Sequence, residues 1–236
     1  MKTVGLLGGM AWDSSLEYYR ILNEEVARKL GGFHSAKCIL HSLDFHEIEL
    51  AQHEGRWHDA GQIMADAGIK LKGAGADFIV ICTNLMHKVA DDVSRATGLP
   101  LLHIIDVTAA AIEARGLKRV GLLGSIFTME GDFYIRRLAE RHGIEAIVPC
   151  EKDRQAVSNA VYYELKPETF TERTMACFRE VIGRLMAAGA QGVILGCTEI
   201  PLFIKQKDFS VPLFDTTTLH ARAAAAYALG EFEIEP

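Results

Sequence analysis

The segment VGLLG occupies Val4–Gly8 and returns unchanged at Val120–Gly124. Further along the chain, AGADFIVICTN at Ala74–Asn84 is matched by AGAQGVILGCT at Ala188–Thr198. The two pairs occur in the same order and are offset by 116 and 114 residues. Ordered self-similarity of this kind predicts that one structural unit is duplicated within the chain.

A third pair extends the repeat, because LPLL at Leu99–Leu102 corresponds to VPLF at Val211–Phe214, an offset of 112 residues. These segments belong to a set of short Val-, Ile- and Leu-rich stretches bounded by Gly, Pro or charged residues. Such stretches are typical of buried parallel strands. The eight predicted strands lie within residues 2–8, 36–45, 76–82, 99–104, 118–124, 144–149, 191–196 and 211–215.

Helical patterns lie between these strands. Apolar residues follow Ser14 at steps of three and four, and we expect a capping box of Ser14 with Glu17 where that helix begins. A second capping box is expected at Thr169 and Glu172, in a helix that ends at Gly189. Strands that alternate with helices of this length predict a mostly parallel α/β architecture.

We therefore predict two similar flavodoxin-like lobes with parallel sheets, related by a pseudo-twofold axis. Residues 1–98 would form lobe one and residues 99–215 lobe two, with a last helix at 216–230 packing back on lobe one. A length of 236 residues alone leaves one or two domains open, since domains commonly have about 150 residues. Ligands of such sheets bind at the carboxyl ends of strands, so we expect the active site in a cleft between the lobes.

Composition and charge exclude several classes of protein. With 49% hydrophobic and 24% charged residues, the chain has the balance of a globular protein, not of a disordered one. The net charge is -6 and the sequence has no long run of charges of one sign, so it shows no basic patch that would bind nucleic acid or an anionic membrane. The sequence has no apolar run of ~20 residues and no secretory pattern at its start. We expect a cytoplasmic protein.

The five cysteines are odd in number and form no CxxC pair, which argues against a disulfide framework or a zinc ribbon. A zincin motif is also missing, because Leu50 stands where a histidine would have to follow His46 and Glu47. The glycine-rich stretch at residues 5–10 lacks the spacing of a nucleotide-binding loop. We therefore expect neither a metal nor a nucleotide cofactor.

Cys197 follows a predicted buried strand and precedes a predicted helix start at Thr198–Glu199. Free N–H groups and the helix dipole favour an anion there, so we expect the thiol pKa to fall below its usual value of about 8.5. The alternative interpretation is a small buried hydrophobic side chain. The 114-residue offset aligns Cys197 with Thr83, and Gly196 with Cys82.

Three motifs resemble the aspartate/glutamate racemase family of cofactor-independent amino-acid racemases: LLGGMAWDSS at Leu6–Ser15, ICTNLMH at Ile81–His87 and GCTEIP at Gly196–Pro201. The likeness continues through HSLDFHEIE at His41–Glu49 and YYELK at Tyr162–Lys166, so that it spans nearly the whole chain. The resemblance implies a two-lobe fold with an amino-acid substrate between the lobes, no pyridoxal phosphate, and a homodimer.

In that family, one cysteine removes the α-proton from one face of the substrate and a second delivers a proton to the opposite face. The resemblance assigns these places to Cys197 and Thr83, because a threonine stands where the usual Cys-Asn-Thr motif has its cysteine, as in some Thr-Asn-Thr members. A hydroxyl is a much weaker acid than a thiol, so we expect a kinetically asymmetric reaction with Cys197 as the base for the L enantiomer. Cys82 is expected to pack into lobe one.

The resemblance also implies how the substrate is held. Lys166 would pair with the distal carboxylate, while Asn84 and Thr198 would bind the α-amino and α-carboxylate groups. Glu199 would modulate the thiol or cap its helix, and Leu85 replaces a hydroxyl residue that commonly helps to hold a carboxylate. The complete set of candidate substrate-binding residues is Met10, Gln52, Asn84, Leu85, Thr128, Lys166, Thr198 and Glu199.

Three functions fit this pattern. The first is racemisation of aspartate or glutamate. The second is a single-cysteine decarboxylation like that of arylmalonate decarboxylases, in which Cys197 protonates an enolate formed by loss of carbon dioxide. The third is a binding protein that kept the cleft but lost catalysis. We favour racemisation because Cys197, Lys166 and Asn84 are all present.

Overall fold

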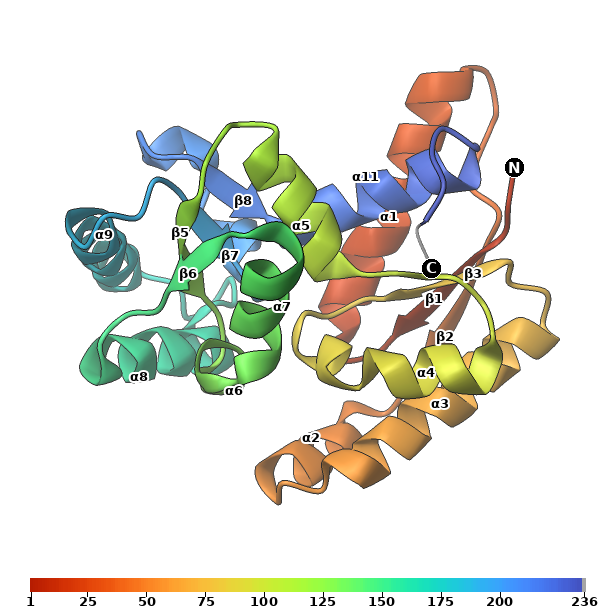
Figure 1. Ribbon diagram of the computed structural model, residues 1–236, viewed down its shortest axis with the longest axis horizontal. Coiled ribbons are helices and arrows are strands. Elements are labelled where there is room, and N and C mark those ends of the chain that lie inside the picture. Colours follow the sequence, from red (N-terminus) through yellow and green to blue (C-terminus); the bar gives the residue numbers. More distant parts are fainter. Residues whose placement is uncertain (235–236) are drawn as a thin grey trace. The chain divides into compact units, whose positions relative to one another are not determined.

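The computed structural model describes residues 1–234, which fold into two compact units. The first comprises residues 1–104 and those from 220 onward, and the second comprises residues 105–219. Each contains a four-stranded parallel sheet with flanking helices, which confirms two similar α/β lobes (Figure 1). The chain changes unit a few residues beyond the predicted lobe ends at 98 and 215.

In the first unit the strand order is β2-β1-β3-β4, the order of a flavodoxin-like sheet. Every residue of the central strands β1 and β3 is buried, because α1 covers one face of the sheet and α3 and α4 the other (Figure 1). The strands are β1 (Val4–Gly8), β2 (Cys38–Ser42), β3 (Phe78–Ile81) and β4 (Leu101–Leu102). The helical elements are α1 (Trp12–Leu30), α2 (Phe45–His53), α3 (Trp57–Gly73), the 3₁₀ turn η1 (Leu85–Val89) and α4 (Ala90–Thr97).

The second unit repeats this plan with the strand order β6-β5-β7-β8. Its strands are β5 (Arg119–Leu123), β6 (Glu145–Ile147), β7 (Val193–Leu195) and β8 (Leu213–Asp215). Its helices begin with α5 (Ile104–Glu113), α6 (Ile126–Glu130), α7 (Asp132–His142), α8 (Glu151–Asn159) and the π-helical turn η2 (Ala160–Glu164). They continue with α9 (Glu172–Ala187), α10 (Ile200–Phe203) and the 3₁₀ turn η3 (Gln206–Asp208), and the last helix, α11 (Thr216–Ala228), passes from the second unit to the first. All eight predicted strands are thus present.

The register of the two sheets matches the repeat in the sequence. Leu7 of β1 lies opposite Ile81 of β3, and Leu123 of β5 lies opposite Leu195 of β7. The first members of these pairs are separated by 116 residues and the second by 114, the offsets seen in the sequence. The duplication therefore extends to individual backbone positions.

The repeat continues one residue past each third strand. The N–H of Cys82 donates to a β1 carbonyl at 2.9 Å, and the N–H of Gly196 donates to the equivalent β5 carbonyl at 2.6 Å. Thr83 and Cys197 follow these two residues. They therefore occupy the same position in their own units, at the carboxyl end of a central strand.

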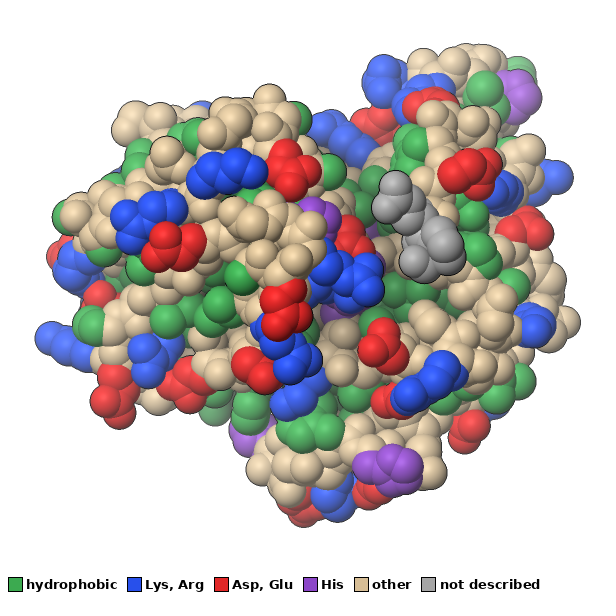
Figure 2. Space-filling view, in the orientation of Figure 1, with side chains coloured by type: hydrophobic (Ala, Val, Ile, Leu, Met, Phe, Trp, Pro, Cys, Tyr) green, Lys and Arg blue, Asp and Glu red, His purple; other side chains and the backbone are tan. Residues whose placement is uncertain are grey.

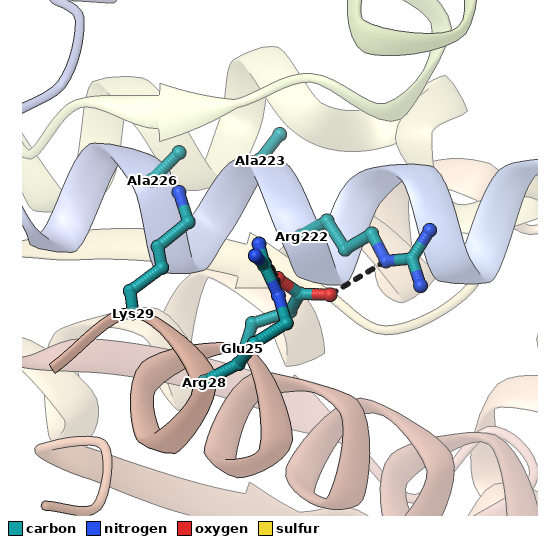
Figure 3. Close-up of a pocket in the computed structure, with 6 residues that line it drawn as sticks. All are labelled: Glu25, Arg28, Lys29, Arg222, Ala223 and Ala226. Atoms are coloured by element: carbon teal, nitrogen blue, oxygen red, sulfur yellow. Dashed lines mark hydrogen bonds and ion pairs between the residues drawn. The ribbon is translucent and has the colours of Figure 1, made fainter. Parts of the chain in front are cut away.

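Helix α11 begins in the second unit, and its later turns pack on the first. The buried His220 ring accepts a hydrogen bond from the Tyr18 hydroxyl (2.8 Å to Nδ1) and donates from Nε2 to a β4 carbonyl at 2.9 Å. Burial lowers the pKa of His220 to about 4, so the ring is neutral. Further along the two helices, Glu25 of α1 accepts from Arg222 at 2.8 Å and from Arg28 at 2.7 Å (Figure 3). A buried polar contact and an ion-pair network thus attach α11 to α1.

The predicted capping box at Ser14 is wrong. Helix α1 begins earlier, at Trp12, and Ser14 and Ser15 are buried in its first turn. The Ser15 hydroxyl instead accepts the backbone N–H of Gly9 at 2.8 Å. Gly9 has a φ of 95°, and a Cβ there would lie 2.2 Å from the Leu43 carbonyl oxygen. The glycine-rich loop therefore packs tightly against its own unit, which sets the helix start.

The second predicted capping box is displaced by two residues. Helix α9 begins at Glu172, and its N-cap is Thr171, whose side chain accepts the N–H of Thr174 at 3.3 Å. The Thr169 hydroxyl donates instead to the Glu164 carbonyl at 3.1 Å, which closes the turn after η2. Two nearby threonines, Thr169 and Thr171, could cap this helix. Because Thr169 bonds to the preceding turn, Thr171 serves as the N-cap.

Candidate active site

The carboxyl end of β3 carries the first candidate group. Thr83 is half-buried, and Asn84 and Leu85 after it are buried. His87 Nε2 accepts the N–H of Ile104 at 3.2 Å, so the proton of the ring is on Nδ1, which donates to the Thr83 carbonyl at 2.8 Å. The imidazole therefore fixes the backbone of Thr83 relative to the end of β4.

Cys82 points away from this position. Its side chain is 1% exposed, and its Sγ lies 3.8 Å from the Val80 carbonyl oxygen. Burial raises the pKa of this thiol far above its ordinary value. Because the Cys82 thiol is buried against β3 whereas Thr83 is only half-buried, the Thr83 hydroxyl stays the candidate acid–base group at this strand end.

The carboxyl end of β7 carries a different set of groups. Cys197 is half-buried, and its Sγ donates to Glu199 Oε2 at 2.8 Å. The hydroxyl of Thr198 donates to the same carboxylate oxygen at 3.1 Å. The thiol and the hydroxyl thus converge on one acceptor, and the three consecutive residues form a connected polar cluster.

This cluster overturns the expected electrostatics of Cys197. Burial raises the pKa of the thiol well above its ordinary value, and the negative charge of Glu199 and its hydrogen bond act in the same direction. Hydrogen bonds from the N–H groups of Glu199 and Thr198 oppose the shift with less effect. The expected lowering was wrong because α10 begins only at Ile200 and has four residues, whereas a carboxylate lies directly beside the sulfur.

Lys166 is the cation that the resemblance places at the distal carboxylate. It follows the π-helical turn η2, and its side chain is exposed. Within residues 1–234 its ammonium group makes no ion pair, whereas most arginines of the second unit are paired with carboxylates. Lys166 is therefore free to bind an anionic group.

The remaining candidates are buried in the segments that follow strands, one in a loop and two in helices. Met10 lies after β1 and is 4% exposed, and Gln52 of α2 donates from Nε2 to Met86 Sδ at 3.1 Å. In the second unit, Thr128 of α6 shares a 3.2 Å hydrogen bond with Ser125, the residue after the VGLLG repeat. Sulfur is a weak acceptor, so the Gln52 amide keeps the capacity to bind a stronger one.

Each unit contributes half of the candidate residues. The first holds Met10, Gln52, Thr83, Asn84 and Leu85, and the second holds Thr128, Lys166, Cys197, Thr198 and Glu199. Among the described residues, no group of three or more His, Cys, Asp or Glu side chains could hold a metal ion. No helix within residues 1–234 has the length and apolar character to cross a bilayer.

A groove of about 480 Å³ lies apart from these residues, between α1 and α11 (Figure 3). It is lined by Glu25, Arg28, Lys29, Arg222, Ala223 and Ala226. Its charged groups are paired, because Glu25 binds both arginines and Lys29 Nζ lies 2.5 Å from Glu231. We interpret the groove as part of the ion-pair network that attaches α11 to α1.

The family model for Asp/Glu/hydantoin racemases matches residues 7–224, most of the chain. The chain belongs to the Asp/Glu/hydantoin racemase family. A Yersinia pestis protein described as a candidate Asp/Glu racemase is 54% identical, with 97% of this chain and 100% of that chain covered and a TM-score of 0.91. An aspartate racemase homologue from Pyrococcus horikoshii OT3 is 35% identical, with the same coverage and a TM-score of 0.84.

A curated relative extends the comparison to a wider range of substrates. The broad-specificity amino-acid racemase of Bacillus subtilis (strain 168) is 24% identical over 162 residues, which are 68% of this chain and 69% of the relative. As a racemase-family member, the chain is an isomerase whose family acts on small molecules.

A cluster of three histidine rings in the first unit of this racemase could not be predicted from the sequence. The ring of His87 lies 4.7 Å from that of His103 and 5.6 Å from that of His220. These histidines are far apart in the chain and have no common motif. The only local signal was the spacing of four residues between Thr83 and His87, which allows a side chain to reach a preceding carbonyl.

Proposed function

We propose that this racemase interconverts the enantiomers of an acidic amino acid, aspartate or glutamate, without a cofactor. Cys197 exchanges a proton with the α-carbon on one face, and Thr83 serves the other face. The observation that carries the proposal is the matched register of the two sheets, which gives Thr83 and Cys197 equivalent places after β3 and β7. Inversion of a carbon needs an acid and a base on opposite sides, and a duplicated unit can supply both.

Charge supports an acidic substrate. An exposed, unpaired Lys166 offers a partner for the distal carboxylate of aspartate or glutamate. Asn84 and Thr198 are proposed to hold the α-amino and α-carboxylate groups, with Gln52 as a further donor. The lining residues Met10, Leu85 and Thr128 add little charge of their own, so Lys166 would decide the preference for a second carboxylate.

The two acid–base groups differ in strength, so the saturated rates in the two directions are expected to differ. Cys197 is the competent base for the L enantiomer, and Thr83 acts as a proton relay. The equilibrium constant between enantiomers in water is one, so kcat/KM must be equal in both directions. Asymmetry is therefore expected in kcat and in proton exchange, not in kcat/KM.

Incubation of L-aspartate and L-glutamate in D2O tests the proposal directly. We expect deuterium at the α-carbon together with formation of the D isomer, and loss of both in Cys197→Ala. Retention of both activities in Cys197→Ala would refute the assignment of the base. Release of carbon dioxide from a substituted malonate without α-exchange on amino acids would favour the single-cysteine decarboxylase. Ligand-induced thermal stabilisation with no exchange would indicate a binding protein.

We also propose a homodimer, supported by an apolar stripe on α1. Trp12, Leu16, Tyr19 and Leu30 are 64, 55, 50 and 46% exposed and lie within about 40° of one line along the helix. Phe33, just beyond α1, is fully exposed. These side chains leave on the order of 600 Å² of apolar surface in water, close to the ~800 Å² that each partner contributes to a standard interface.

We propose a second copy of the chain as the partner of this stripe, because an exposed apolar helix face can pack against the same face of a twofold-related copy. The charges beside it need no partner, since Arg20 pairs within α1 with Glu17 and Glu24. On the face shown in Figure 2, charges of both signs are interspersed, so no large single-sign patch on that face offers a competing docking site.

Sedimentation velocity of the full chain tests the homodimer. We expect a dimer for the parent protein and a folded monomer for the double variant Leu16→Glu/Tyr19→Glu. Ile69→Glu is the matched control, because Ile69 is 48% exposed on α3 and lies outside the stripe. A monomeric parent protein, or a double variant that remains dimeric, would refute the use of this stripe.

A further inference from the structure

The groove between α1 and α11 lies within the first unit, because its lining residues fall at positions 25–29 and 222–226 (Figure 3). None of these lining residues belongs to the candidate active site at the strand ends. The groove volume of about 480 Å³ falls within the range of ~300–1,000 Å³ that is typical of small-molecule sites. The groove is thus large enough for a small ligand, and its chemistry decides which class of ligand it can bind.

Two alanines create the hollow on the side of α11. Ala223 and Ala226 are three residues apart, so they share one face of the helix. Both are half-buried, whereas Ala224 and Ala225 between them are fully buried in the first unit. Because a methyl group fills little space, this face of α11 leaves room between the longer basic side chains that line the groove (Figure 3).

Positive charge prevails in the groove. Burial alone would raise the pKa of Glu25, but the hydrogen bonds and charges of Arg28 and Arg222 outweigh it and hold that pKa below its ordinary value. Glu25 is therefore a carboxylate at neutral pH, and two guanidinium groups share its single charge. Lys29 is balanced by Glu231. These five side chains carry three positive and two negative charges, which leaves a positive surplus in a chain whose net charge is -6.

The two guanidinium groups keep donors that Glu25 does not use. Arg28 binds Oε2 of the carboxylate through Nε and Nη2, and Arg222 binds Oε1 through Nε. Within residues 1–234, Nη1 of Arg28 and both Nη atoms of Arg222 have no hydrogen-bond acceptor. The side chains of Arg28 and Arg222 are 66 and 61% exposed, so a ligand in the groove can reach these atoms. Such N–H groups bind phosphate oxygens through short, charge-assisted hydrogen bonds.

We propose that the groove between α1 and α11 is a binding site for a phosphate-bearing small molecule, whose phosphate accepts hydrogen bonds from Arg28 and Arg222. A phosphate monoester has up to two negative charges and three terminal oxygens, which suit donors on two separate guanidinium groups. A carboxylate has only one charge and two oxygens, and Glu25 already supplies one to the same arginines. The organic part of the ligand lies against Ala223 and Ala226. Binding at this groove does not depend on the racemisation proposed above.

A ligand in this groove also stabilises the position of the last helix. Helix α11 begins in the second unit, and its later turns pack on the first. A phosphate held by Arg28 of α1 and Arg222 of α11 bridges the two helices, so its binding free energy favours the docked helix. Saturating ligand is therefore expected to raise the Tm of the full chain.

Isothermal titration calorimetry of the full chain tests the site with two probes, inorganic phosphate and adenosine monophosphate (AMP), at constant ionic strength. We expect one AMP molecule to bind per chain with a Kd of about 1 mM or tighter. Free phosphate should bind several-fold more weakly, because it lacks the organic part that contacts Ala223 and Ala226. Equal affinities for the two probes would overturn the part of the proposal that concerns this organic group.

Four variants locate the binding. Arg28→Gln and Arg222→Gln each remove one guanidinium group and leave the other paired with Glu25, so both should fold and bind AMP about tenfold more weakly, the scale of one lost charge-assisted hydrogen bond. Ala223→Glu keeps both arginines but places a carboxylate in the groove, and it should abolish the binding. Arg179→Gln is the matched control, because Arg179 is an exposed arginine of α9 that is paired with a carboxylate outside the groove. This control should bind AMP like the parent.

Lys166→Gln distinguishes the groove from the candidate active site. AMP binding that is lost in Lys166→Gln but unchanged in Arg28→Gln and Arg222→Gln would overturn the proposal. A folded parent protein that binds neither probe would also overturn it. Thermal unfolding gives an independent reading, in which saturating AMP raises the Tm of the parent and of Arg179→Gln but not that of Ala223→Glu. An equal rise in Ala223→Glu would place the ligand outside the groove and refute the site.

Discussion

The two units end their third strands with the same backbone but with different chemistry. After β3 the chain presents a hydroxyl and a buried leucine, Thr83 and Leu85, and after β7 it presents a thiol and a carboxylate, Cys197 and Glu199. The shared register shows that side chains can change at these positions while the fold is preserved. Under the proposed function, we expect catalytic strength to depend on the side chains at these two strand ends, while the duplicated backbone provides their positions.

The largest effect is expected from removing the stronger group. Cys197→Ala should lower both racemisation and α-deuteration of L-aspartate by roughly 10³-fold, because general acid–base catalysis contributes on the order of 10²–10⁴-fold. The measurement is mass spectrometry of the amino acid after incubation in D2O, with circular dichroism to confirm the fold. Activity within tenfold of the parent would mean that the two strand ends do not differ as proposed.

Substitutions of Thr83, the weaker acid–base group, test the same difference between the two strand ends. Thr83→Ala should lower formation of the D isomer by about 100-fold while deuterium still enters the L isomer, because Cys197 can abstract and return a proton on its own face. Thr83→Cys should do the opposite and raise kcat, since a thiol is a stronger acid than a hydroxyl. Chiral chromatography coupled to mass spectrometry follows both products. Equal loss of exchange and inversion in Thr83→Ala would show that Thr83 is needed for the first step.

Most of the fold could be predicted from the sequence, because the strands, the internal repeat and the strand register all follow from the local pattern of apolar residues. The buried strands read as continuous runs of Val, Ile and Leu, and the offsets of the repeat return in the pairing of Leu7 with Ile81 and of Leu123 with Leu195. Helix starts were less predictable. Ser15 is used by the Gly9 backbone, a contact six residues away that no capping pattern contains.

The pKa of the Cys197 thiol was harder to predict than the set of residues that could form the candidate site. A cysteine before an expected helix start predicts a lowered thiol pKa, but the helix begins three residues later and the side chain of Glu199 turns back to the sulfur. That outcome depends on one rotamer and on burial, which a sequence does not specify. The histidine ring contacts around His87 are similar, because they join β4 and α11 to the β3 end over long sequence distances.

The smallest effect is expected at the cysteine that only neighbours the site. Cys82→Ala should leave kcat and kcat/KM within about twofold of the parent, because the Cys82 thiol is buried and directed at the Val80 carbonyl. Loss of the buried sulfur should lower the free energy of unfolding by about 1 kcal/mol, a typical value for a small buried truncation. Steady-state kinetics and urea unfolding measure the two quantities. A Cys82→Ala variant that lost racemisation while Thr83→Ala kept it would transfer the second acid–base role to Cys82, and the hydroxyl would no longer be the group that makes the two strand ends unequal.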